Sequence, residues 1–152
     1  MNVAFIPVRG GSKSIPLKNI KPMCGKPLVY WTVAAACGCA KIDKVYVATD
    51  SEKIRETLLE VKQQEENEAF QKLEVIGRSA ESASDTASTE FAMLEFANEH
   101  AFDHIVLIQA TSPLLTAEDL HYMKKRTPTV CSLWYGRNGL TGMWQKMERH
   151  RH

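Results

Sequence analysis

The chain has 152 residues, of which 44% are hydrophobic and 24% are charged, and its formal net charge is +1 at pH 7. These values are typical of one globular domain with a single core. The nearly neutral charge gives no argument for binding nucleic acid or a membrane surface. No apolar stretch approaches the roughly 20 residues that a membrane span needs.

Strand and helix patterns alternate along the first third of the chain. The apolar run Val3–Ile6 predicts a first strand. Residues 28–37, rich in alanine, predict a buried helix that begins at Pro27, where a missing N–H costs nothing, and that ends near Gly38. Residues 45–48 are mostly β-branched or aromatic and predict a second strand.

The alternation continues through the middle of the chain. Residues 49–52 have the T-x-x-E form of a capping box, which predicts a helix directly after them. Residues 73–76 and 105–108 predict two more strands, and Asp85 can cap a helix between them. Residues 116–119 have the S/T-x-x-D/E form that starts another helix.

This order of elements predicts an α/β fold with a mostly parallel sheet and helices on both faces. In such sheets, ligands bind beyond the carboxyl ends of the strands. Polar loops follow the strands predicted at residues 3–6, 73–76 and 105–108. We therefore expect these three loops to meet at one edge of the sheet.

The first of these loops contains glycines and cations. The adjacent Gly10 and Gly11 can adopt positive φ and turn backbone amides toward an anion. Arg9, Lys13 and Lys18 add positive charge, which suits a triphosphate-transfer site, because such reactions depend mainly on positioning and charge neutralisation. The loop is neither a Walker A loop nor a G-x-G-x-x-G turn. The alternative is a solvated loop with ordinary surface cations.

Three segments of the chain are similar to motifs of one enzyme family, in the same order. They read V-R-G-G-S-K-S-I-P-L-K-N with G-K-P-L within residues 8–28, R-S-A-E-S-A-S-D-T-A-S-T at 78–89, and I-Q-A-T-S-P-L-L-T at 108–116. They resemble the acylneuraminate cytidylyltransferases (CMP-sialic acid synthetases), and the resemblance ends near residue 120. It implies a Rossmann-like nucleotidyltransferase fold and transfer of CMP from CTP to a nine-carbon 2-keto sugar acid, with release of pyrophosphate.

The resemblance also implies roles for individual residues. The cations that would stabilise the phosphates and the pyrophosphate leaving group are Arg9, Lys13 and Lys18. The residues that would hold the nucleotide are Gly10, Gly11, Ser12, Asn19, Arg78, Ser88 and Thr89. Those that would hold the sugar acid are Gln109, Thr111 and Ser112. The chain departs from the family pattern at Ser14, where glycine is commoner, at Ser79 and Ala110, where proline is usual, and at Leu115, where arginine is frequent.

The resemblance further implies Mg²⁺ and a homodimer, with CTP and a sugar acid as partners. The late D-x-D pair that binds the metal in this family and its dimerisation segment do not occur in this sequence, so the metal ligands are unknown. Asp50 follows a strand and could reach a metal or cap a helix. The four cysteines form no C-x-x-C pair, and no secretory signal is visible, which together indicate free thiols and a cytoplasmic protein.

We expect residues 1–126 to form an incomplete, apparently truncated cytidylyltransferase-like domain and residues 127–152 to form an atypical tail. The tail has three glycines, two tryptophans and a basic end, which do not predict a strand that continues the sheet. One hypothesis is that the tail is read out of frame, because back-translating residues 130–144 two bases out of phase permits a valine-rich run like that of the family. Truncation would impair activity.

Two other functions fit the sequence. The first is a different sugar nucleotidyltransferase, acting on the eight-carbon acid Kdo or on a hexose phosphate. Relatives of the Kdo type tend to have an acidic residue directly after the fourth strand, where this chain has Gln109 and Ala110. The second is a truncated nucleotide-binding fragment without catalytic activity.

Overall fold

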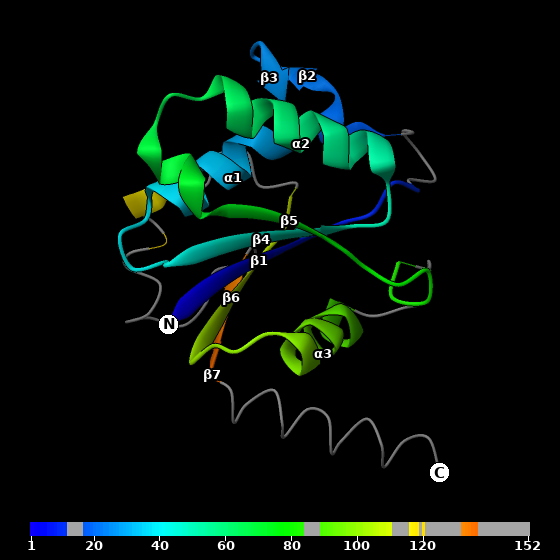
Figure 1. Cartoon of the computed structure of the whole chain (residues 1–152), viewed down its shortest axis with the longest axis vertical. Helices are drawn as coiled ribbons and strands as arrows, with labels where there is room; N and C mark the ends of the chain where they lie inside the picture. Colours follow the sequence, from blue (N-terminus) through cyan, green and yellow to red (C-terminus); the bar gives the residue numbers. More distant parts are fainter. Residues whose placement is uncertain (12–16, 84–88, 111–115, 119, 121–131, 137–152) are drawn as a thin grey trace.

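A five-stranded sheet forms the centre of the protein (Figure 1). The computed structural model describes residues 1–11, 17–83, 89–110, 116–118 and 120, and the backbone of 132–136. The strands lie in the order β5-β4-β1-β6-β7, with bounds β1 (Asn2–Val8), β4 (Lys44–Thr49), β5 (Leu73–Gly77), β6 (His104–Ile108) and β7 (Ser132–Gly136). The first four run parallel and correspond to the four predicted strands.

Helices cover both faces of the sheet, as predicted. Helices α1 (Leu28–Gly38) and α2 (Glu52–Gln64) lie on one face, and α3 (Thr89–Glu99) lies on the other (Figure 1). Alternate side chains of each strand enter one of the two cores because successive residues of a strand point to opposite faces. In β1, Ile6 and Val8 pack with α1 and α2, whereas Phe5 packs with α3.

Helix α2 begins with a different cap from the one predicted. Its N-cap is Ser51, whose hydroxyl accepts a hydrogen bond from the Ile54 amide at 3.4 Å. Thr49 is the last residue of β4 and pairs with Gly77 of β5, and its hydroxyl accepts from the Ser51 amide at 3.1 Å. The T-x-x-E prediction is therefore wrong about the capping residue, because strand pairing holds Thr49 in the sheet.

Four short elements were not predicted. They are the 3₁₀ helices η1 (Lys18–Ile20) and η2 (Glu68–Lys72) and the strands β2 (Pro22–Met23) and β3 (Lys26–Pro27). The hairpin turn between β2 and β3 consists of Cys24, with φ 50°, and Gly25, with φ 82°. Two successive positive φ angles are the pattern of a type I′ turn, which matches the twist of the flanking strands.

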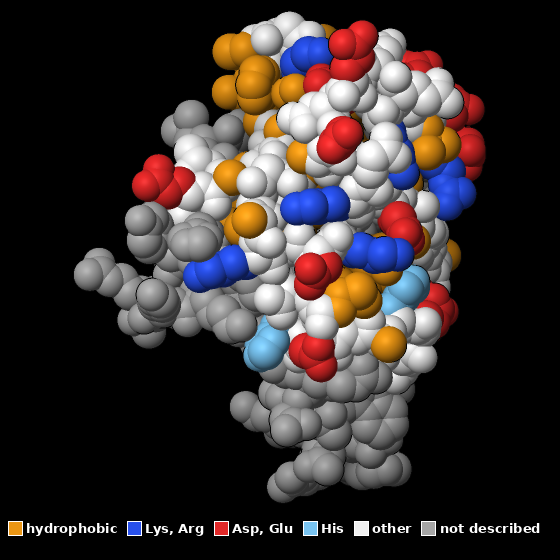
Figure 2. Space-filling model, turned by 60° about the vertical axis from the view of Figure 1, so that its left-hand side comes forward, with side chains coloured by type: hydrophobic (Ala, Val, Ile, Leu, Met, Phe, Trp, Pro, Cys, Tyr) orange, Lys and Arg blue, Asp and Glu red, His pale blue; other side chains and the backbone are white. Residues whose placement is uncertain are grey.

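The surface has mixed charge on the face shown in Figure 2, where Lys and Arg side chains are interspersed with Asp and Glu side chains. Hydrophobic side chains gather at the top of this view, at the level of the β2–β3 hairpin (Figures 1 and 2). In that hairpin Met23 is 38% exposed. Within the described ranges, no helix combines the length and the apolar character needed to cross a membrane.

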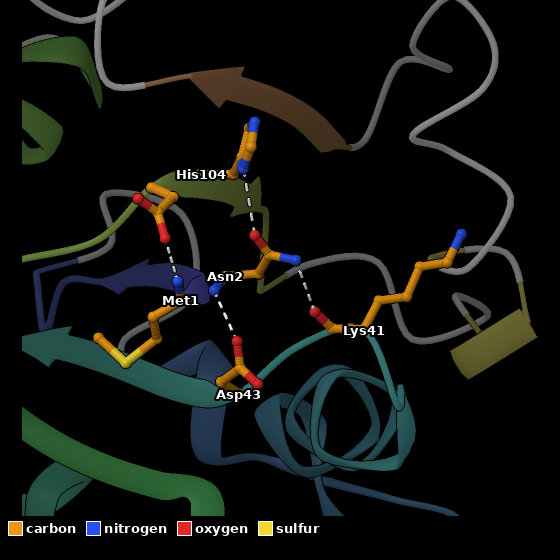
Figure 3. A network of polar contacts seen from close by, with 6 residues as sticks. Met1, Asn2, Lys41, Asp43 and His104 are labelled. Atoms are coloured by element: carbon orange, nitrogen blue, oxygen red, sulfur yellow. Dashed lines mark hydrogen bonds and ion pairs between the residues drawn. The ribbon is translucent and has the colours of Figure 1, made fainter.

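A polar network joins the amino ends of the central strands (Figure 3). The Met1 amino group pairs with Asp103, and the Asn2 amide donates to the Asp43 carboxylate at 2.7 Å. The His104 ring lies 3.2 Å from the Asn2 side-chain oxygen. These contacts connect β1 to the segments that enter β4 and β6. They lie at the end of the sheet opposite to the one where the predicted site lies.

The tail contains a strand that the sequence analysis did not anticipate. The backbone of β7 pairs antiparallel with β6, with His104 opposite Gly136 and Ile108 opposite Ser132. The expectation that the tail adds no strand is therefore wrong, since the run from Leu133 to Tyr135 suits a strand by composition. The helix predicted after residue 116 begins as expected: the Leu120 amide donates to the Thr116 carbonyl at 3.3 Å.

Candidate functional site

The strand order defines where a ligand can bind. From β1 the chain proceeds to β4 and β5 on one side and then crosses to β6 on the other side of β1. Such a reversal opens a crevice beyond the carboxyl ends of the two strands at the switch point, here β1 and β6. Arg9 and Gly10 directly follow β1, and Gln109 directly follows β6. Two of the three predicted loops therefore flank this position.

Gly10 is held by its amide and by a close packing contact. Its N–H donates to the Asp50 carboxylate at 2.9 Å. A Cβ at this position would lie 2.7 Å from the Cβ of Ser51, the residue that caps α2. Neither Gly10 nor Gly11 has a positive φ, so the predicted reason for the glycine pair is wrong. Gly10 is required by the close approach of β1 to the start of α2, whereas a Cβ on Gly11 would meet nothing within 4 Å.

Asp50 has a role that sequence reasoning missed. It was expected either to cap α2 or to reach a metal, but Ser51 caps the helix and the Asp50 carboxylate accepts the Gly10 amide. Among the residues that the structure describes, no group of three His, Cys, Asp or Glu side chains could hold a metal ion. These residues do not by themselves form a magnesium site, and Mg²⁺ stays a prediction.

Arg78 reaches the same edge of the sheet from the loop after β5. Its guanidinium donates to the Ser82 carbonyl and, from Nε, to the Ser82 hydroxyl at 3.3 Å. Burial lowers the pKa of Arg78, the carboxylates of Asp50 and Glu95 oppose that shift, and the charge of Arg9 adds to it. The charges of Arg9, Asp50 and Arg78 therefore act on one another at this edge of the sheet, where the sequence analysis expected the loops after β1 and β5 to meet.

Asn19 supports the first loop from within the protein. It lies in η1, is 6% exposed, and its amide nitrogen donates to the Arg9 carbonyl at 3.5 Å. Its side-chain oxygen is buried and has no hydrogen-bond partner within the part of the chain that the structure describes, and an unsatisfied buried oxygen costs about 1–3 kcal/mol. Asn19 therefore orients the backbone at Arg9, and a further donor at this oxygen would stabilise the loop. The neighbouring Lys18 is partly exposed.

The loop after β6 is anchored from α1. Gln109 is exposed, whereas Ala110 is 5% exposed and its carbonyl accepts a hydrogen bond from the Thr32 hydroxyl at 3.3 Å. Thr32 is fully buried in an otherwise apolar helix. Sequence reasoning did not select it, although a threonine within a largely apolar helix is a signal that its hydroxyl has a specific partner.

The remaining predicted residues divide into two groups. Thr89 is the first residue of α3. Five predicted site residues lie outside the described part of the chain: Ser12, Lys13, Ser88, Thr111 and Ser112. The predicted helix cap Asp85 lies outside it as well. Near Arg78, Ser79 donates two hydrogen bonds to Glu95, which sequence reasoning did not anticipate.

A parallel sheet of this strand order, with Arg9, Arg78 and Gln109 directly after the carboxyl ends of its strands, has the architecture of a nucleotide-binding α/β protein. The sequence agrees with this class in a more specific way. The family model described as cytidylyltransferase matches residues 3–128. The chain therefore belongs to the cytidylyltransferase family.

Relatives within this family act on sugar acids, according to their names. The chain is 39% identical to N-acylneuraminate cytidylyltransferase A of Danio rerio over 118 residues, which is 77% of this chain and 25% of that protein. It is 35% identical to pseudaminic acid cytidylyltransferase of Campylobacter jejuni over 121 residues, 78% of this chain and 50% of that one. The chain thus spans between a quarter and half of the length of these relatives.

A solved structure with the same fold is a CMP:2-keto-3-deoxy-manno-octonic acid synthetase complexed with CTP. It matches with a TM-score of 0.68 and 21% sequence identity, over 82% of this chain and 46% of that one. At this identity the likeness concerns the fold alone.

Proposed function

We propose that this chain is the nucleotide-binding part of a cytidylyltransferase that transfers CMP from CTP to a nine-carbon 2-keto sugar acid of the N-acylneuraminate type. The observation on which the proposal rests is the convergence of Arg9, Gly10 and Arg78 at the carboxyl edge of the sheet, beside the switch point that Gln109 also flanks. The named relatives supply the substrate class.

The proposed reaction is a displacement at phosphorus. The anomeric hydroxyl of the sugar acid attacks the α-phosphorus of CTP, a new oxygen–phosphorus bond forms, the bond to the β-phosphate breaks, and the hydroxyl proton is released. Arg9, Lys13 and Lys18 would neutralise the triphosphate and the departing pyrophosphate. Gly10, Gly11, Ser12, Asn19, Arg78, Ser88 and Thr89 would hold the nucleotide, and Gln109, Thr111 and Ser112 would hold the sugar acid.

Three further parts of the proposal concern the assembled enzyme. Mg²⁺ would complete the site in the full-length family, and the homodimer is proposed from the resemblance alone. A cytoplasmic location is supported by the unpaired thiols of Cys24, Cys37 and Cys39, which fit a reducing compartment.

Two alternatives differ from the proposal in measurable ways. A Kdo-type enzyme would release pyrophosphate with Kdo, but that enzyme class tends to place an acidic residue where Gln109 lies. A non-catalytic nucleotide-binding fragment would bind CTP and release no pyrophosphate.

Two assays on the purified chain separate these functions. CTP affinity is measured by titration calorimetry, and pyrophosphate release is measured with CTP, Mg²⁺ and, in separate reactions, N-acetylneuraminate, Kdo and a hexose phosphate. The proposal predicts release with N-acetylneuraminate. Release with Kdo or with the hexose phosphate alone selects the other transferase, and CTP binding without release selects the fragment.

The Arg9→Ala variant tests the site itself. Removing a guanidinium that contacts phosphate should weaken CTP binding by about tenfold or more, since charge-assisted hydrogen bonds contribute about 1.5–3 kcal/mol. Lys53→Ala, which removes an exposed cation from α2, is the matched control and should leave CTP affinity unchanged. Equal CTP affinity for wild type and Arg9→Ala would refute the proposed phosphate site.

A further inference from the structure

Both carboxylate oxygens of Glu95 accept hydrogen bonds from the loop after β5. One oxygen accepts the Ser79 amide at 3.0 Å, and the other accepts the Ser79 hydroxyl, also at 3.0 Å. Glu95 lies in α3, on the opposite side of the sheet from α1 and α2. A bidentate contact from a regular helix restrains both the backbone and the side chain of Ser79, because charge-assisted hydrogen bonds are the stronger kind.

The contact continues from Ser79 to Arg78 through Ser82. The Ser82 amide donates to the Ser79 hydroxyl at 3.0 Å, and the Ser82 hydroxyl donates to the Ser79 carbonyl at 3.0 Å. The Arg78 guanidinium donates to the hydroxyl and to the carbonyl of Ser82. Ser82 is only 1% exposed, so this turn is a built structure rather than a surface loop with incidental contacts.

The orientation of Arg78 matters because the guanidinium stands among charges of both signs. The carboxylates of Asp50 and Glu95 attract it, and Arg9 repels it. The Ser79–Ser82 turn sets the orientation of the guanidinium among these charges, because it engages the guanidinium on two acceptors of one residue, the hydroxyl and the carbonyl of Ser82.

We infer that Glu95 is a positioning residue, which fixes the Arg78 guanidinium at the carboxyl edge of the sheet by clamping Ser79 and, through it, Ser82. This inference deepens the proposed function and rests on it for the identity of the ligand.

Two measurements test the inference on the full chain. The first is the exchange rate of the Arg78 Nε proton, followed by nitrogen-15 NMR and assigned with Arg78→Lys, which reports the clamp without any ligand. The second is the CTP dissociation constant. Glu95→Ala removes both acceptors, Glu95→Gln keeps an oxygen for the Ser79 amide, and Glu99→Ala removes an exposed carboxylate one turn further along α3 as the control.

Glu95→Ala should accelerate Arg78 Nε exchange at least tenfold and weaken CTP binding by about five- to tenfold. Glu95→Gln should recover most of the wild-type Arg78 Nε exchange rate and CTP affinity, and Glu99→Ala should match wild type in both. A merely structural role of Glu95 would lower the unfolding midpoint without selective exchange at Arg78, so circular dichroism melts accompany each variant.

The two proposals fail separately. Wild-type exchange at Arg78 in a folded Glu95→Ala variant overturns the positioning role, as does an unchanged CTP affinity of that variant when wild type binds. If wild type binds no CTP, the proposed function fails, while the exchange comparison still decides whether Glu95 positions Arg78. If Glu95→Ala does not fold, Ser79→Ala takes its place, because it removes only the hydroxyl that links Glu95 to the Ser82 amide. Ser79→Ala should accelerate Arg78 Nε exchange in the same way, and unaltered exchange there overturns the inference.

Discussion

Replacing Gly10 by alanine tests the packing that holds the first loop. The added Cβ would lie 2.7 Å from the Ser51 Cβ, so the two atoms must move apart by roughly 0.7 Å to reach the 3.4 Å of ordinary contact. Ser51 is fixed as the α2 cap, and the displacement therefore falls on the backbone of Gly10. Overpacking of this kind costs about 1–3 kcal/mol, and the displaced amide loses part of its bond to Asp50.

We expect Gly10→Ala to lower the free energy of unfolding by about 2 kcal/mol and to weaken CTP binding. Urea denaturation at constant slope measures the first effect, and the midpoint should fall by about 1 M, since slopes are about 1–3 kcal/mol per M. Gly11→Ala is the matched control, because no atom of the described residues lies within 4 Å of a Cβ built at Gly11. Alanine reduces the entropy of the unfolded chain equally in both variants, so their difference isolates the contact. Equal unfolding midpoints for the two variants would refute this reasoning.

Single side chains also control stability, thiol reactivity and the pH dependence of stability. Thr32→Val leaves the buried Ala110 carbonyl without its hydroxyl donor and should lower the free energy of unfolding by about 1–2 kcal/mol, measured by urea titration; an unchanged midpoint would contradict it. Burial raises the pKa of Cys37 to about 12, so iodoacetamide at mildly alkaline pH should modify the exposed Cys24 and leave Cys37 intact by mass spectrometry. Burial raises the pKa of Glu95, but hydrogen bonds from Ser79 and Ser82 and the charge of Arg78 together lower it below its usual value. The ionised Glu95 therefore stabilises the fold fully above the usual glutamate pKa, and this stabilisation is lost as the pH falls through the lowered pKa. Glu95→Gln should remove that acid-dependent loss from the pH profile of the urea midpoint.

Local patterns in the sequence predicted much of the architecture. The apolar runs that became β1, β4, β5 and β6 were recognisable because strands buried on both faces contain little else. The rule that ligands bind beyond the carboxyl ends of parallel strands then placed Arg9, Arg78 and Gln109 at one edge. Where prediction failed, the competing contact was distant in sequence: pairing with β5 held Thr49 in the sheet, and pairing with β6 formed β7 from the tail.

The succession of strands and helices along the chain, its family and the charge of its first loop could be predicted from the amino-acid sequence, because hydrophobic periodicity and short motifs are properties of neighbouring residues. The folded structure was needed to explain why Gly10 must be a glycine and what Asp50, Thr32 and Glu95 do. Each of these depends on an atom that lies 15 or more residues away along the chain, and no local pattern specifies such a distance. Folding brings these pairs together, and the contacts that result hold the loops of the candidate site.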